Sequence, residues 1–153
     1  MDITTSKRVR TEGTEKPTTL FDFHRKNGSW SYNFDPIQVE KDEPIMSNEV
    51  QTEDGVETTE TEATETTTTR QVWQWYIIDV GGIKTRDNVK KRVMDFLWGV
   101  DYENKLTNEY NAYKEKITTD KEVVTAYKTF LQERLAVMEK IDSDFSNLNS
   151  TEE

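Results

Sequence analysis

The chain has 153 residues, a net charge of −10 and no cysteine, with 33% hydrophobic and 33% charged residues. So low an apolar content predicts that only part of the chain packs into a core. The absence of cysteine excludes a disulfide scaffold, a thiolate metal site and a cysteine nucleophile. The sequence contains no run of 18 apolar residues, so it does not predict a membrane-spanning helix. Its first residues lack the apolar core of a signal peptide, so we expect synthesis in the cytoplasm.

The charge is concentrated in the middle of the chain. Residues 1–39 carry six bases and five acids (+1), residues 40–69 one base and ten acids (−9), and residues 70–153 thirteen bases and fifteen acids (−2). Residues 1–17 are polar and predict a flexible N-terminus. Residues 46–70 are rich in threonine and glutamate and cannot offset the entropy of ordering, so they predict an acidic linker. We interpret this linker as a spacer that separates two docking elements.

Residues 18–45 predict an aromatic β-hairpin followed by an extended segment. Asn27-Gly28 suits the centre of a type I′ turn, in which both residues need positive φ. That turn predicts the cross-strand pairs Arg25–Trp30, Phe23–Tyr32 and Phe21–Phe34, with all the aromatic rings on one face. Pro36 and Pro44 bracket the extended run, because proline would interrupt a central strand.

A domain of one strand and three helices is predicted over residues 71–146, followed by a flexible tail at 147–153. On the strand, Val72 to Val80, the side chains of Trp73, Trp75 and Ile77 alternate with a second apolar set, which predicts cover on both faces or a partner on one. The first helix follows Thr85 as N-cap and stops at Gly99. Together these elements predict an α+β fold.

The other two helices are expected to form an antiparallel hairpin. The second is expected from Asp101 to about Ile117, and the third after a capping box at residues 119–122. Heptad spacing on the third helix predicts a packing seam, which suits the second helix or another subunit of a homo-oligomer. The seam consists of Val124, Tyr127, Leu131, Arg134, Met138, Ile141 and Phe145.

Motifs for catalysis are scarce. His24 is the single histidine and falls on the polar face of the hairpin, where an exposed structural role is the simpler interpretation. The segment 80–86 places two glycines between a strand and a helix but lacks the Walker spacing, and Asp142-Ser143-Asp144 lacks the glycine and glutamate of a calcium loop. Four tryptophans suit base stacking, but the acidic surroundings make nucleic acid an improbable ligand. We therefore expect no enzyme, no cofactor and no metal.

Several short motifs resemble small tail-associated proteins of tailed bacteriophages and prophages. They are Trp30-Ser31-Tyr32 with Val39-Glu40, Asp79-Val80, the stretch from Glu109 to Tyr113, and Tyr127 with Phe130, Leu131 and Arg134. The resemblance implies a non-enzymatic virion or tail-assembly role, assembled in the host bacterial cytoplasm, with other virion proteins as partners. The acidic tract looks like an insertion into that pattern.

The alternative hypothesis is an acidic DNA mimic that inhibits a host nucleic-acid-binding enzyme, which the net charge of −10 suggests. Such a mimic needs carboxylates held at fixed spacing, and here they lie mainly in the predicted linker. Under the docking hypothesis the candidate partner-binding residues are the aromatic and apolar side chains of the hairpin, strand and last helix. They are Phe21, Phe23, Trp30, Tyr32, Phe34, Trp73, Trp75, Tyr127, Leu131 and Met138.

Overall fold

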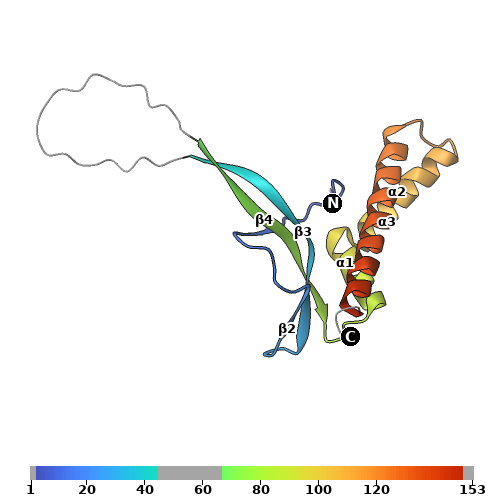
Figure 1. The fold of residues 1–153 in the computed structure, drawn as a ribbon. Helices are drawn as coiled ribbons and strands as arrows, with labels where there is room; N and C mark the ends of the chain where they lie inside the picture. Colours follow the sequence, from blue (N-terminus) through green and yellow to red (C-terminus); the bar gives the residue numbers. More distant parts are fainter. Residues whose placement is uncertain (1–2, 45–66, 150–153) are drawn as a thin grey trace, which may run out of the picture.

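The computed structural model describes residues 3–44 and 67–149, which form a four-stranded antiparallel sheet and three helices. The predicted α+β fold is confirmed. In chain order the elements are β1 (Thr11–Gly13), β2 (Phe21–His24), β3 (Ser29–Pro44), β4 (Thr67–Gly81), α1 (Arg86–Leu97), α2 (Gly99–Lys114) and α3 (Glu122–Asn149). The sheet order is β1-β4-β3-β2, and the helices lie on one side of the sheet (Figure 1).

The core lies between that face and the helices. On β4 the side chains of Tyr76, Ile78 and Val80 are buried, while Ile77 and Asp79 between them are exposed. Their partners in the core include Val89, Val93 and Leu97 of α1 and Val137 and Ile141 of α3. Each fully buried aliphatic side chain of this kind contributes about 1.5–3 kcal/mol. The predicted alternation on the strand is therefore correct, although the strand is longer than residues 72–80.

The β2–β3 hairpin forms, but in a different register from the predicted one. Phe21 pairs with Tyr32 and Phe23 with Trp30, a shift of two residues. The backbone N–H groups of Asn27 and Gly28 both donate to the His24 carbonyl, and of the two only Gly28 has positive φ, at 67°. The connection is thus a four-residue loop rather than a type I′ turn. Because the shift is even, the rings stay on the expected face.

Strand β3 continues through Pro36, where an interruption is predicted. Phe34 pairs with Tyr76 and Ile37 with Gln74, so Asp35 and Pro36 together face a single residue of β4. This is a β-bulge, a position at which a missing N–H does not break the ladder. Asp35 adopts positive φ (53°) there, and its carboxylate pairs with Arg10 at 2.6 Å. The bulge also turns the inward side chains of β3 from even to odd positions.

The two segments expected to dock at separate places are neighbours in one sheet. Strands β3 and β4 pair from Trp30↔Gly81 to Pro44↔Thr67. The prediction that a spacer separates them is therefore wrong, and residues 67–70 of the predicted linker belong to β4. The rest of that linker, residues 45–66, and the tail residues 150–153 lie outside the described residues.

The prediction of a flexible N-terminus is wrong for residues 3–17. Ile3 is buried, and the backbone N–H groups of Thr4 and Thr5 donate to the Glu133 carboxylate of α3. Farther along, β1 pairs with β4, with Thr11 opposite Trp75. The polar composition misleads here because, apart from the buried Ile3, hydrogen bonds of polar side chains and backbone groups hold the arm.

The three helices agree with the prediction in number and order, and differ at their ends. Gly99, with φ of 73°, begins α2 directly after α1, while Ile117 lies beyond the end of α2 and is 80% exposed. At the start of α3 the Asp120 carboxylate accepts the Glu122 N–H at 2.9 Å, in place of the predicted capping box. The helices α2 and α3 are adjacent, as expected for a helical hairpin.

The buried face of α3 is turned by about one residue from the predicted seam. Phe130, Val137 and Ile141 are buried, whereas Leu131 is 43% exposed. Two polar residues, Glu133 and Asp144, occupy the buried stripe. A heptad pattern built from apolar residues alone misses such a face.

Candidate functional site: interaction surfaces

The β3–β4 ribbon, defined here as residues 37–44 and 67–72, extends past the body of the protein (Figure 1). β1 pairs only with residues 73–75 of β4, and β2 pairs only with residues 29–32 of β3. Among the described residues the two ribbon strands therefore have only each other as β-ladder partners. Both outer edges present backbone N–H and C=O groups that a further strand could pair with.

One ion pair of the described ribbon connects it to β1, and another joins its two strands. Lys41 binds Glu12 of β1 at 2.9 Å, and Arg70 binds Glu43 across the ribbon at 2.8 Å. Hydrogen bonds from Lys41 and Gln74 lower the pKa of Glu12. The described ribbon thus carries the bases Lys41 and Arg70 among the acids Glu40, Asp42 and Glu43.

The outer face of the sheet carries tryptophans instead of helices. Trp73 and Trp75 are half-buried there, and the neighbouring Ile77 is 46% exposed. Lys16 lies 5.5 Å from the centre of the Trp73 ring, and the Trp75 ring packs against Gly13. The indole N–H of Trp75 is buried and has no hydrogen-bond partner among the described residues.

The segment 14–20 partly covers this outer face. β1 and β2 lie at opposite edges of the sheet, so the chain crosses from one edge to the other between them. The Asn33 backbone N–H donates to the Leu20 carbonyl at 2.8 Å, and the Asn33 side chain donates to the Thr19 carbonyl at 3.0 Å. The crossing segment thus contacts the outward-facing Asn33, which is buried.

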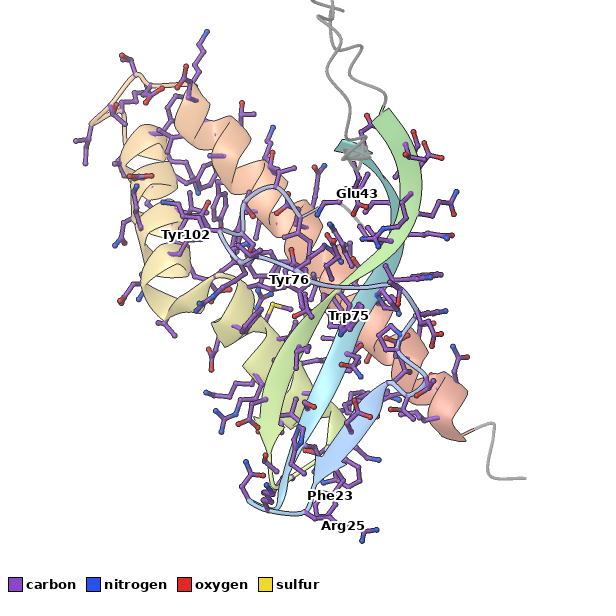
Figure 2. All side chains as sticks on the ribbon, turned by 90° about the vertical axis from the view of Figure 1, so that its left-hand side faces the viewer. Phe23, Arg25, Glu43, Trp75, Tyr76 and Tyr102 are labelled. Carbon is purple, nitrogen blue, oxygen red and sulfur yellow. The ribbon has the colours of Figure 1, made fainter. Side chains whose placement is uncertain are left out.

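A second exposed cluster, the basic tip, lies at the opposite end of the sheet from the ribbon. Figure 2 shows Phe23 and Arg25 at one end of the sheet and Glu43 at the other. Phe23 is 50% exposed and packs on Trp30 at 4.9 Å between ring centres, and the Lys84 ammonium lies 4.3 Å above the same Trp30 ring. The basic tip consists of Phe23, Arg25, Lys26, Trp30, Ile83 and Lys84.

The N-terminal arm, residues 3–10, is held by hydrogen bonds to the Glu133 carboxylate of α3, a site that we call the Glu133 seat. Thr4 and Thr5 each donate a backbone N–H and a hydroxyl to the two carboxylate oxygens of Glu133. Burial raises the pKa of Glu133, but these hydrogen bonds outweigh burial and hold the pKa below its ordinary value. The Trp98 indole, directly after α1, donates to the Thr5 hydroxyl at 2.7 Å, and the Ser6 hydroxyl donates to the Leu97 carbonyl of α1 at 2.8 Å, so the arm also ties α1 to α3.

His24, Asp144 and the glycine-containing segment 80–86 all make structural hydrogen bonds. His24 shares a 2.7 Å hydrogen bond with Ser31, its neighbour on the outer face. The buried Asp144 accepts from Tyr32 at 2.6 Å and pairs with Lys140. In the glycine-containing segment 80–86, the Gly81 N–H donates to the Asp79 carboxylate at 2.8 Å. Among the described residues, no group of three or more acidic, histidine or cysteine side chains is placed to hold a metal ion.

The structure separates the candidate partner-binding residues into two groups. Phe21, Tyr32 and Phe34 are in the protein's own core, so the expectation that they contact a partner is corrected. Trp30, Trp73, Trp75, Tyr127 and Met138 are half-buried, and Phe23 and Leu131 are exposed. They do not form one site. Phe23 and Trp30 are at the basic tip, the other tryptophans are on the outer face, and the remaining three are on α3.

Sequence reasoning missed the Glu133 seat and the contribution of Ile83 and Lys84 to the tip. The basic run from Arg25 to Lys26 beside a glycine turn was an available signal for the tip, but its proximity to Lys84 depends on the fold.

Comparison with known proteins identifies no relatives. No family model, no curated protein and no solved structure matches the chain. Within the described ranges, no helix has the length and apolar character required to cross a membrane.

Proposed function

We propose that this chain is a non-enzymatic structural or assembly protein of a tailed bacteriophage, which docks on larger virion proteins through the β3–β4 ribbon. The observation that carries the proposal is the extension of the ribbon beyond β1, β2 and the helices, with both edges open among the described residues. The second half of β3, residues 37–44, lies in this ribbon and so places a docking element at a distance from the core.

The edge of β4 is the more suitable of the two edges for a partner strand. β3 carries Lys41 and Pro44 in this region, residues that natural edge strands use against further pairing. β4 offers Thr68 and Thr69, which are β-branched and uncharged. A partner strand would continue the line of β1 along residues 67–72, so that main-chain hydrogen bonds give affinity and alternate side chains give specificity.

A non-enzymatic role is supported by the use of the buried carboxylates. Asp35, Glu133 and Asp144 are all buried, and each is bound by side-chain or backbone donors that connect distant parts of the fold. Groups so engaged stabilise structure and are not free to exchange protons with a substrate.

The virion context rests on the resemblance of short motifs, among them Trp30-Ser31-Tyr32 and Asp79-Val80, to tail-associated proteins of tailed bacteriophages. The DNA-mimic alternative has less support, because Lys41 and Arg70 interrupt the negative charge of the described ribbon. A mimic would need an unbroken row of carboxylates at phosphate-like spacing.

A shortened ribbon tests the proposal. Replacing residues 41–70 with Asn-Gly would join Glu40 to Gln71 through a two-residue hairpin turn. The core cluster contains none of the removed residues, so the variant is expected to fold and to keep its thermal stability. We expect it to be lost from purified phage particles, as measured by mass spectrometry of the particles.

The matched control replaces only residues 45–66 with a short turn and leaves the ribbon in place. This control is expected to remain with the particles. Incorporation of the shortened-ribbon variant at the level of the unmodified chain would contradict docking through the ribbon.

A further inference from the structure

The basic tip carries cations that have no ion-pair partner within residues 3–44 and 67–149. Arg25 and Lys26 are exposed in the β2–β3 loop, and Lys84 is exposed in the loop after β4. The two loops are in contact, because a Cβ atom on Gly82 would lie 3.6 Å from the Gly28 carbonyl oxygen. The nearby carboxylates are engaged: Asp22 accepts from Thr19 and Asn33, and Asp79 accepts from the Gly81 N–H.

The same tip has exposed apolar surface. Phe23 and Ile83 are 50% and 65% exposed, and Lys84 covers the Trp30 ring. Beside them is a hollow of about 430 Å³, lined by residues 18–21, Lys84, Asn147 and Leu148. A surface that combines cations without an ion-pair partner in the described ranges, aromatic rings and a hollow suits an acidic segment that also contains aliphatic side chains.

This chain contains a segment of that chemistry. Residues 45–66 hold seven carboxylates, no lysine and no arginine, together with Ile45, Val50 and Val56. Both ends of the segment join the far end of the ribbon, at Pro44 and Thr67.

The segment cannot reach the basic tip of its own chain. The tip lies at the Ser29 end of β3, whereas the segment leaves from Pro44. At about 3.3 Å per residue, those two ends of β3 are roughly 50 Å apart. A segment of 22 residues that leaves and returns at one place extends at most about 38 Å from it. An acidic segment on this tip must therefore come from another copy.

We propose that the basic tip is the docking site for residues 45–66 of a second copy of this chain, so that the protein associates with itself through charge complementarity. This self-association is separate from the proposed docking on virion proteins through the ribbon edge. It predicts strong dependence on salt, because exposed charges are screened within about 10 Å at 0.1 M ionic strength.

Sedimentation velocity of the full chain over a range of concentrations measures the association. We expect concentration-dependent oligomers in 20 mM salt and monomers in 500 mM salt. The tip variant Arg25→Glu/Lys26→Glu is expected to raise the dissociation constant about tenfold or more, because it replaces attractions with repulsions. The control Lys114→Glu/Lys121→Glu makes the same charge change at two exposed positions, the last residue of α2 and the residue before α3, and is expected to associate like the unmodified chain.

A mixing experiment identifies the occupant. The segment variant Glu57→Gln/Glu60→Gln/Glu62→Gln/Glu65→Gln keeps the basic tip, and the tip variant keeps the acidic segment. Each variant alone is expected to be monomeric, and their equimolar mixture is expected to form a complex of one copy of each.

A protein that stays monomeric at every concentration in low salt would overturn the proposal. Oligomers that persist in the tip variant would overturn it as well. So would salt-sensitive binding of a single-stranded oligonucleotide to the tip without self-association.

Discussion

The Glu133 seat provides the sharpest test of how the N-terminal arm is held. Replacing Glu133 with glutamine keeps the size of the side chain and removes its charge. In the folded protein the carboxylate accepts the Thr4 N–H at 2.8 Å, the Thr5 N–H at 3.1 Å and both threonine hydroxyls. The glutamine carbonyl can still accept from one threonine, but its NH₂ group would face the donors of the other.

The expected cost follows from those contacts. A hydrogen bond to a charged group contributes about 1.5–3 kcal/mol, and a buried donor left without a partner costs about 1–3 kcal/mol. The hydrogen bonds to Glu133 are part-buried, so water can replace some of what is lost. We therefore expect Glu133→Gln to lower the free energy of unfolding by about 2–3 kcal/mol. For a chain of this size that corresponds to a fall in Tm of roughly 5–10 °C.

Urea denaturation and thermal unfolding, both followed by circular dichroism, measure this change. Hydrogen exchange at Thr4 and Thr5 should accelerate in the same variant. The control is Glu139→Gln, an exposed position on the same helix, which should change stability by less than about 0.5 kcal/mol. A Glu133→Gln protein as stable as the Glu139→Gln control, with unchanged exchange at Thr4 and Thr5, would refute the role assigned to this seat.

Three further predictions follow from individual contacts. Hydrogen bonds that outweigh burial lower the pKa of Glu133 below 4.5, so the stability that its carboxylate contributes is present above pH 4.5 and is lost as the pH falls below that value. The difference in unfolding free energy between the unmodified chain and Glu133→Gln should therefore shrink between pH 6 and pH 3 in urea titrations. A constant difference would contradict the assignment. Tyr32→Phe removes the 2.6 Å hydrogen bond to Asp144 and should cost about 1–3 kcal/mol in the same assay, whereas Tyr113→Phe should cost little; equal effects would contradict the contact. Gly28→Ala should lower the free energy of unfolding by about 1 kcal/mol through the positive φ alone, because nothing lies within 4 Å of the added Cβ. The control Gly82→Ala should leave thermal unfolding nearly unchanged. An unchanged stability of Gly28→Ala would contradict the loop conformation.

The elements that depend on local patterns were predictable from the sequence. The alternation along β4, the apolar stripe of α1 and the order of the three helices follow from spacing alone. The aromatic face of the hairpin was also predictable, because an even shift of register leaves each side chain on its face.

The errors arise where distant polar groups decide the structure. The two buried acids Glu133 and Asp144 turn α3 away from its apolar heptad, because Thr4, Thr5 and Tyr32 donate hydrogen bonds to them from distant parts of the chain. The bulge at Asp35 and Pro36 is stabilised by Arg10, which lies 25 residues away in the sequence. No local pattern contains these contacts.

The same reason explains the incomplete prediction of the candidate surfaces. Phe21, Tyr32 and Phe34 share the composition of an interface, but the helices of the same chain cover them. Strands β3 and β4 pair directly although the acidic residues 45–66 lie between them in the sequence. From composition alone, this acidic tract predicts a spacer that keeps the two strands apart.

Photo-crosslinking in intact particles tests the proposed docking role most directly. A photoreactive amino acid at Thr69 places the probe on the ribbon, and the same group at Asn104, an exposed position of α2, serves as the control. Docking through the ribbon predicts cross-links from position 69 to a larger virion protein and none from position 104. Absence of the chain from particles, or cross-links from position 104 alone, would contradict the account.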